Sequence, residues 1–228
     1  MVDDQNKKKE KCKAGMEFSR RDFLKTSGIV VISVGLGSCT ILQGGTASKG
    51  YLLVDTKKCP GCMTCMLACS LVPEGFESLS RARIQMVQNP FESFPNDKNI
   101  AQCRQCVEPA CLAACPADAL HVDKANGNVR TVDEEKCIGC KSCVKACPFE
   151  PGRSIWNFEE DHAQKCDLCV DSGFWQEQGG PSGKQACVTV CPMRAIQFTT
   201  EIPDQIGDEG YDVNLRDESW GAWGYTTE

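Results

Sequence analysis

Cysteine is the residue type in this sequence that could do chemistry, both by its number and by its spacing. The chain has 228 residues and 18 cysteines, and sixteen of the cysteines form four groups of four. These quartets are Cys59, Cys62, Cys65 and Cys69; Cys103, Cys106, Cys111 and Cys115; Cys137, Cys140, Cys143 and Cys147; and Cys166, Cys169, Cys187 and Cys191. Thiolates bind iron–sulfur clusters, four to each [4Fe–4S] cluster. The quartets therefore predict four [4Fe–4S] clusters, and a chain with four clusters is expected to transfer electrons.

The spacing within the quartets supports cubane clusters. The first and third quartets have the pattern C-x2-C-x2-C-x3-C, in which three close thiolates bind one cluster and the fourth binds another. The second quartet has C-x2-C-x4-C-x3-C, and the fourth has a spacer of seventeen residues between Cys169 and Cys187. Three quartets end in Cys-Pro, at Pro116, Pro148 and Pro192. Proline turns the chain out of the cluster loop because it fixes φ and lacks an N–H.

Three other roles are open to so many cysteines. Zinc sites usually consist of separated C-x2-C pairs, often with histidine, and this chain has only His121 and His162. A zinc-stabilised, non-redox binding module is therefore the alternative of a different class. A disulfide framework is typical of smaller exported chains, and it does not explain the ferredoxin spacing. The clusters could also be purely structural, but four are more than a chain of this length needs.

Composition and charge bound the remaining functions. Apolar residues make up 41% of the chain and aromatic residues only 7%, which predicts a core made largely of cysteines and clusters. The apoprotein is therefore expected to be largely unfolded. The net charge is −6; without residues 1–38, which hold eight basic and five acidic residues, 17 basic and 26 acidic residues give −9. This charge argues against nucleic acid or an anionic lipid surface as a partner.

The amino terminus has the layout of an export signal. Five lysines between residues 7 and 13 form a basic region, and Ser19-Arg20-Arg21-Asp22-Phe23-Leu24-Lys25 precedes an apolar stretch, Thr26 to Ser38. This layout matches the twin-arginine pattern S-R-R-x-F-L-K, whose export route carries folded proteins. We therefore expect residues 1–47 to be a twin-arginine signal and the protein to work in the periplasm or at the outer face of the cytoplasmic membrane. The apolar stretch is short for a membrane span, although retention as an uncleaved anchor stays open.

Two cleavage sites are open. Leu36-Gly37-Ser38-Cys39 resembles a lipobox, in which Cys39 would become the lipidated first residue and anchor the protein to a membrane. The other site follows Ala47, where Gly45-Thr46-Ala47 provides the small residues that signal peptidase prefers. Cys12 lies in the basic region and is expected to be a free thiol that is lost with the signal.

The segments between the cysteines must position the thiols, and their patterns predict short strands and short helices. Alternating or apolar runs predict strands at 51–54, 83–87, 119–123, 128–132 and 195–199. Asn126-Gly127, between the third and fourth of these strands, predicts a two-residue hairpin loop. Helix formers between the third and fourth cysteines, as in 112–114 and 144–146, predict short helices. The recurring unit is a cluster loop, a short helix and a strand.

The whole pattern resembles the four-cluster ferredoxin-type subunits of molybdenum and tungsten oxidoreductase complexes. These include the iron–sulfur subunits of dimethyl sulfoxide, polysulfide and tetrathionate reductases, formate dehydrogenase beta subunits and nitrite-reductase-associated electron carriers. The resemblance covers residues 51–200 and is carried by the quartets and by the phrase Cys103-Arg104-Gln105-Cys106-Val107-Glu108-Pro109-Ala110-Cys111. It implies an α+β fold of two ferredoxin-like dicluster modules of the βαββαβ type. The inner module, 101–147, would be inserted in an outer module formed by 48–100 and 148–200, followed by an acidic, aromatic tail at 201–228.

The resemblance also implies how the cysteines pair. One cluster would be bound by Cys59, Cys62, Cys65 and Cys191, and a second by Cys166, Cys169, Cys187 and Cys69. The inner pair would be bound by Cys103, Cys106, Cys111 and Cys147, and by Cys137, Cys140, Cys143 and Cys115. Some relatives have tryptophan in place of one cysteine and hold a three-iron cluster there, whereas this chain keeps every cysteine.

Substrate chemistry is expected on another subunit. The chain has no G-x-G-x-x-G, G-K-[ST], H-E-x-x-H or C-x-x-C-H motif and no convincing nucleophile–base pair, so no catalytic residue is predicted. The resemblance implies a catalytic partner with a molybdopterin or tungstopterin cofactor and a membrane quinone-reactive subunit or cytochrome, between which electrons pass one at a time. A periplasmic hydrogenase or a cytochrome nitrite reductase is the alternative partner. The twin-arginine export machinery would be a further, transient partner.

Several cations lie within or beside the cysteine runs: Arg104, Lys141, Lys145, Lys165 and Arg194. A cation at such a position favours the reduced cluster, which is the more negative state. Any one of them could equally be an ordinary solvated or salt-bridged residue, so the sequence assigns none of them a role.

Two segments lie outside the recurring unit. The glycine-rich spacer 170–186 predicts a surface loop, with Phe174 and Trp175 as an apolar contact. The tail carries four aromatic residues, Tyr211, Trp220, Trp223 and Tyr225. Exposed aromatic side chains often pack on a partner. The tail either does so, or it folds onto its own domain or is disordered, and these possibilities are open.

Overall fold

The computed structural model describes residues 46–224. The predicted twin-arginine pattern, Cys12 and Cys39 lie outside these residues. The elements are short, and every strand has four residues. In chain order they are β1 (Tyr51–Val54), η1 (Thr56–Lys58), α2 (Thr64–Glu74), β2 (Gln85–Gln88), β3 (Lys98–Ala101), α3 (Ala110–Ala113), β4 (Leu120–Asp123), β5 (Val129–Val132), α4 (Ser142–Lys145), β6 (Ser154–Asn157), β7 (His162–Lys165), α5 (Ala186–Val190), β8 (Ile196–Thr199) and α6 (Glu218–Gly221). Within residues 46–224, no helix has the length and apolar character needed to cross a membrane.

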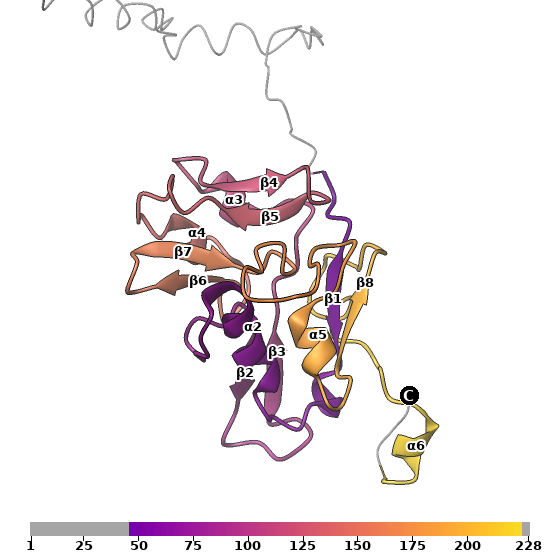
Figure 1. Ribbon diagram of the computed structural model, residues 1–228. Coiled ribbons are helices and arrows are strands. Elements are labelled where there is room, and N and C mark those ends of the chain that lie inside the picture. The colour runs from indigo at the N-terminus through magenta and orange to yellow at the C-terminus, as the bar shows by residue number, and fades with distance from the viewer. Residues whose placement is uncertain (1–45, 225–228) are drawn as a thin grey trace, which may run out of the picture. The chain divides into compact units, whose positions relative to one another are not determined.

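The strands form four two-stranded antiparallel sheets, which pair β1 with β8, β2 with β3, β4 with β5 and β6 with β7 (Figure 1). β1 and β8 come from opposite ends of the cysteine-rich region, with Tyr51 opposite Thr199 and Val54 opposite Ile196. A single two-stranded sheet is marginally stable in water, so none of these sheets would persist alone. Their stability has to come from the loops and helices between them, where the cysteines lie.

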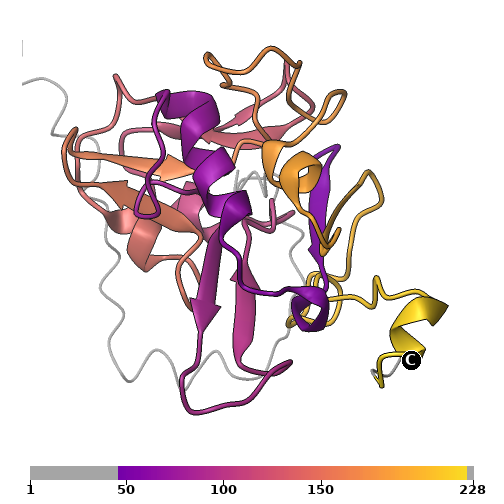
Figure 2. The ribbon, with the colours of Figure 1, turned by 60° about the horizontal axis from the view of Figure 1, so that its bottom comes forward.

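The helices that follow the cysteine loops pack in pairs. α2 packs against α5 (Figure 2), although the two are far apart in the chain, and α3 packs against α4. α2 begins after Met63, whose φ of 59° turns the chain from the cluster loop into the helix, and it ends at Gly75, with φ 77°. Glycine commonly ends a helix at this left-handed position because it has no Cβ to clash. The pairing of α2 with α5 brings the first and fourth cysteine loops together.

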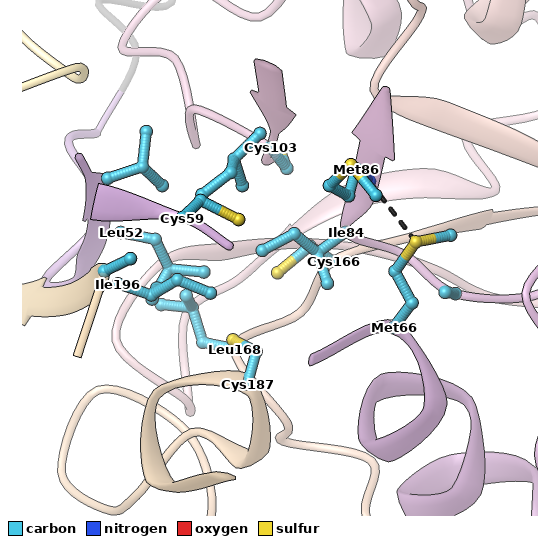
Figure 3. Packing of buried hydrophobic residues seen from close by; sticks show 14 of the residues in the cluster. Leu52, Cys59, Met66, Ile84, Met86, Cys103, Cys166, Leu168, Cys187 and Ile196 are labelled. Carbon is cyan, nitrogen blue, oxygen red and sulfur yellow. Dashed lines mark hydrogen bonds between the residues drawn. The ribbon is translucent and has the colours of Figure 1, made fainter. Parts of the chain in front are cut away.

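Cysteines form a large part of both buried apolar clusters. The larger cluster joins four cysteines from four segments with aliphatic side chains that include Leu52, Ile84 and Ile196; the cysteines are Cys59, Cys103, Cys166 and Cys187 (Figure 3). The smaller cluster consists of Cys111, Leu120, Cys143 and Ala163. The prediction from composition, a core built largely from cysteine, is met only in part, because eleven of the fifteen residues of the larger cluster are aliphatic residues or methionine.

The tail folds back onto its own domain through Arg216, and Lys58 Nζ also lies 5.9 Å from the ring centre of Trp220. The N–H of Val54 donates to the carbonyl of Tyr211 at 2.8 Å, and the carbonyl of Val54 accepts from the N–H of Val213 at 2.7 Å. Tyr211 is completely buried, and its hydroxyl donates to the carbonyl oxygen of Arg104 at 2.8 Å. Of the possibilities for the tail, packing on its own domain is the correct one for this part. Trp223, further on, is 80% exposed.

The predicted strands agree with the observed ones apart from their ends. β1 has the predicted bounds, and β4, β5 and β8 each begin one residue later than predicted. β2 begins at Gln85 rather than at residue 83 and continues to Gln88. Three strands were not predicted, namely β3, β6 and β7, and their sequences are rich in polar residues.

The predicted two-residue loop between β4 and β5 is wrong. Asp123 pairs with Val129, so the loop has the five residues 124–128. The carboxylate of Asp123 accepts hydrogen bonds from the N–H groups of Ala125 and Asn126, at 3.0 and 3.1 Å, and these bonds hold a wider turn. Gly127, which suggested the hairpin, does take a positive φ of 72°.

Candidate iron–sulfur centres

All sixteen quartet cysteines lie within the described residues, and all are free thiols. They lie on the loops that lead into α2, α3, α4 and α5, on these helices and just beyond them. Most are buried or half-buried, while Cys62 and Cys140 are exposed. Between residues 46 and 224, no three His, Cys, Asp or Glu side chains are grouped as ligands of a single metal ion.

The loops of the first and third quartets have the same backbone conformation at the same positions. Gly61 and Met63 have φ of 78° and 59°, and the equivalent Gly139 and Lys141 have φ of 73° and 60°. Left-handed residues at such positions help to turn N–H groups toward one side of a loop, which then favours an anion. The two loops are therefore two copies of one structure suited to an anionic cluster.

A hydroxyl group supports the exposed cysteine in each of these two loops. Thr64 Oγ1 donates to Cys62 Sγ at 3.4 Å, and this hydrogen bond lowers the pKa of Cys62. The side chain of Ser142 lowers the pKa of Cys140 in the same way. A lower pKa favours the thiolate, which is the form that binds iron.

Backbone N–H groups donate to cysteine sulfurs at six further positions. The donor–sulfur distances lie between 3.2 and 3.4 Å for Gly61 to Cys59, Gln105 to Cys103, Leu120 to Cys115, Arg153 to Cys147, Ala186 to Cys169 and Ala195 to Cys191. Hydrogen bonds to the sulfurs are among the interactions that set the potential of an iron–sulfur cluster. Free thiols with amide donors aimed at them are the donor set that a [4Fe–4S] cluster needs, so the residues present fit the predicted cofactor.

Cys65 and Cys187 show which thiols lie together in the outer part of the fold. Burial, together with the neighbouring thiolates of Cys59, Cys191 and Cys62, raises the pKa of Cys65 to about 12. Burial also raises the pKa of Cys187 well above its ordinary value, with contributions from Cys169, Cys69, Cys166 and, last, Cys65. In both cases, cysteines of one quartet lie near the last cysteine of another, and Cys65 lies between the two groups.

The inner quartets show a similar exchange. Burial raises the pKa of Cys111, and among the thiols Cys103 and Cys147 add to this effect. Burial raises the pKa of Cys143 to about 11, with contributions from Cys111, Cys115 and Cys137. Thiols that are neutral and buried at neutral pH must lose protons when they bind iron, so cluster binding is coupled to the folding of these loops.

The cations that the sequence left without a role fall into two groups. Lys141, Lys145 and Arg194 are exposed. Lys165 and Arg104 are buried. The Nζ atom of Lys165 donates to Cys103 Sγ at 2.6 Å, which makes Lys165 a neighbour of the candidate cluster. Sequence reasoning had one signal for this residue, its position directly before Cys166, but nothing in the sequence showed that the side chain turns toward the second quartet.

The spacer 170–186 is tightly packed against the fourth quartet at one glycine. A Cβ added to Gly179 would overlap the carbonyl oxygen of Cys169, whereas one added to Gly173 would meet nothing within 4 Å. Phe174 is 67% exposed, as predicted for the spacer, and its N–H donates to the carbonyl of Val72 at 3.0 Å. The spacer is therefore anchored at Phe174 and at Gly179.

Gly179→Ala is expected to destabilise the protein by about 1–3 kcal/mol, the usual cost of overpacking, and to lower its iron content. The loss should fall on the cluster that includes Cys169, because the backbone of Cys169 has to move. Chemical denaturation and iron analysis measure both effects, with Gly173→Ala as the matched control. Equal stability and iron content in the two variants would contradict this account of the spacer.

Thiol loops with inward N–H donors, connected by two-stranded sheets and short helices, define a ferredoxin-type iron–sulfur protein. The 4Fe-4S dicluster domain family matches residues 98–201. A protein of Haemophilus influenzae named NrfC homolog is 33% identical over 79% of this chain and 79% of its own length. The thiosulfate reductase electron transfer subunit PhsB of Salmonella typhi is 36% identical over 64% of this chain and 73% of its own. The B subunit of the anaerobic dimethyl sulfoxide reductase of Escherichia coli K12 is 33% identical over 67% of this chain and 74% of its own.

The chain therefore belongs to the family of [4Fe–4S] electron-transfer subunits that includes the dimethyl sulfoxide and thiosulfate reductase subunits. It is an electron-transfer subunit of an oxidoreductase complex and not an enzyme by itself. The resemblance inferred from the quartets is confirmed at the level of the family.

Proposed function

We propose that the chain carries four [4Fe–4S] clusters and relays single electrons between a catalytic oxidoreductase subunit and a membrane partner. The observation that supports this most directly is the exchange of thiols between quartets, in which Cys191 lies beside Cys65 and Cys69 beside Cys187. A crosswise ligand links two clusters through one short helix. Such a link fixes the separation on which electron tunnelling depends.

The proposed cluster ligands are the four sets that the family resemblance implies. The outer clusters take Cys59, Cys62, Cys65 with Cys191, and Cys166, Cys169, Cys187 with Cys69. The inner clusters take Cys103, Cys106, Cys111 with Cys147, and Cys137, Cys140, Cys143 with Cys115. Most of the thiols that raise one another's pKa belong to the same proposed set, and the exceptions, Cys111 near Cys143 and Cys65 near Cys187, belong to the adjacent cluster.

We propose further that the two modules are nested, with residues 101–147 inserted in the outer module. Two observations support this arrangement. β1 pairs with β8, and α2 packs against α5, so elements from the two ends of the cysteine-rich region are joined. α3 packs against α4 between them in the chain, as expected for an inner unit.

The proposed catalytic partner is a molybdopterin or tungstopterin oxidoreductase subunit, and the proposed membrane partner is a quinone-reactive subunit or cytochrome. The names of the dimethyl sulfoxide and thiosulfate reductase relatives support this choice. An electron-transfer partner of a periplasmic hydrogenase or cytochrome nitrite reductase is the second candidate. The Haemophilus influenzae relative matches 79% of both chains, and its name mentions neither dimethyl sulfoxide reductase nor thiosulfate reductase. A different catalytic partner therefore stays open.

The proposed location is the periplasm or the outer face of the cytoplasmic membrane. The pattern Ser19-Arg20-Arg21-Asp22-Phe23-Leu24-Lys25 supports export by the twin-arginine route after the clusters are inserted. Lipidation at Cys39 would anchor the protein to the membrane, and mass spectrometry of the mature amino terminus distinguishes it from cleavage after Ala47.

Anaerobically purified protein is expected to be brown, with broad absorption at the blue end of the visible spectrum and about sixteen irons per chain. Dithionite should bleach this absorption, and electron paramagnetic resonance of the reduced protein should show interacting [4Fe–4S] clusters. Iron and acid-labile sulfide analysis provides the count. A colourless protein that contains zinc would overturn the proposed function, and about eight irons per chain would restrict it to one dicluster module.

A further inference from the structure

Lys165 is a buried cation whose nearest anion is a cysteine of the second quartet. It is the last residue of β7, all four residues of which are buried, and it is 6% exposed itself. Its Nζ lies 2.6 Å from Cys103 Sγ, and Cys111 and Cys106 are its next negative neighbours. Among the described residues, no carboxylate forms an ion pair with Lys165. A buried charge is costly unless it is paired, so thiolates, and the cluster they hold, are its counterion.

A buried hydrogen-bond network holds Lys165 at this position. Gln105, which is completely buried, donates from Nε2 to the carbonyl oxygen of Cys166 at 2.6 Å. The amide oxygen of the same side chain accepts from the N–H of Arg130 at 2.7 Å. The loop of the second quartet is thereby tied to the strand that carries Lys165. The side chain has little freedom to turn away from Cys103.

Three arginines add positive charge around the same loop. The guanidinium of Arg130 is fully buried and donates to backbone carbonyls, those of Thr46 and Val107 among them, which carry no net charge. Arg153 is buried; its backbone N–H donates to Cys147 Sγ at 3.2 Å, and its guanidinium donates to the carbonyl oxygen of Pro151 at 2.6 Å. Arg104 is partly neutralised, because it pairs with the exposed carboxylate of Asp208. The surroundings of this cysteine set are therefore strongly positive.

The third quartet lies in a different environment. Its loop contains Lys141, which is exposed, and the Nζ of Lys141 lies over the rings of Trp156 and Phe158 at 4.4 and 5.5 Å from their centres. Cys140 in the same loop is exposed to solvent. Water screens charges near this set far more than it does near the buried Lys165. The two inner cysteine sets thus differ in the number of buried cations and in their access to water.

We propose that Lys165, supported by Arg130, raises the reduction potential of the cluster bound by Cys103, Cys106 and Cys111 above that of the cluster bound by Cys137, Cys140 and Cys143. This inference rests on the proposed function. Reduction adds one electron, and hence one negative charge, beside a cation that the protein keeps in place. The buried cation beside Cys103 stabilises this added charge, and this stabilisation raises the potential. Lys165 is a positioning residue that determines which of the two inner clusters is reduced first.

The test is a redox titration of the full cluster-loaded chain, followed by electron paramagnetic resonance. Lys165→Met removes both charge and hydrogen bond, and Lys165→Gln removes only the charge. Both are expected to lower one midpoint potential by at least about 59 mV, which is a tenfold shift for a one-electron couple. Lys165→Arg should restore most of this shift, and Lys124→Met, at an exposed position in the β4–β5 loop, should leave every potential unchanged.

Unchanged potentials in both neutral variants, at full iron content, would overturn the inference while leaving the proposed function intact. A wild-type protein without clusters would overturn the proposed function instead. If neither neutral variant holds all its iron, the order of the two inner clusters' potentials in the wild-type protein tests the inference. The signal altered by Cys111→Ser must then have a higher potential than the signal altered by Cys143→Ser, and the reverse order would refute the role of Lys165.

Discussion

Cys191→Ser is expected to lose about four of sixteen irons, and the lost cluster should be the one bound by the first quartet. Cys191 belongs to the fourth quartet in the sequence, but its thiolate raises the pKa of Cys65 together with Cys59 and Cys62. A serine hydroxyl is a poorer iron ligand than a thiolate, so the loss of the Cys191 thiolate weakens the whole cluster. A simple reading of the quartets, one cluster for each, predicts the opposite loss.

Three other variants make this test specific. Cys62→Ser and Cys169→Ser identify the resonance signals of the first and the fourth quartet. The signal missing from Cys191→Ser should be the one that Cys62→Ser removes. Cys69→Ser should, in return, remove the signal that Cys169→Ser removes, because Cys69 adds to the raised pKa of Cys187. Loss of the Cys169 signal from Cys191→Ser would refute the crosswise assignment.

A neighbouring position provides the control. Val190 is the last residue of α5, directly before Cys191, and it is 37% exposed. Val190→Ser introduces the same hydroxyl into the same helix without removing a ligand. This variant is expected to keep all of its iron and all four signals. Iron loss from Val190→Ser would mean that the helix, and not the ligand, accounts for the effect at Cys191.

The sequence predicted the parts of the fold that depend on local pattern. β1 was predicted with its observed bounds because Tyr51–Val54 is an apolar run of strand formers. β7, with the sequence HAQK, was missed because its residues are polar, and only tertiary packing buries them. The hairpin was placed correctly but its loop was not, since the side chain of Asp123 decides the turn.

The candidate site also has features that the local sequence predicts and features that depend on tertiary contacts. The cysteines were identified from spacing alone, and the family resemblance supplied the sets, since spacing does not say which distant cysteine completes a cluster. Lys165 was noticed but given no role, because a lysine beside a cysteine is usually solvated. Its burial depends on Gln105, whose side chain connects the second quartet to Cys166 from a distance of 61 residues. Contacts of that kind cannot be deduced from local sequence.

We expect the clusters to hold the fold together. The larger buried cluster of apolar residues contains Cys59, Cys103, Cys166 and Cys187, each from a different segment, and the sheets beside it have only two strands. Without iron these thiols have no bonds to one another, and only the aliphatic side chains and methionines of the cluster would hold the segments together. Two-stranded sheets of four-residue strands cannot supply the missing stability.

Removal of iron with a chelator under reducing conditions is therefore expected to unfold the protein. The cooperative thermal transition should disappear, which corresponds to the loss of the whole stability of an ordinary domain, about 5–15 kcal/mol. Far-ultraviolet circular dichroism and limited proteolysis measure this loss, and rebuilding the clusters from iron and sulfide should restore the transition. The cluster-loaded protein carried through the same buffers without chelator is the control. An iron-free chain that still melts cooperatively would show that the aliphatic groups around Leu52 and Ile84 suffice, and that the clusters serve electron transfer alone.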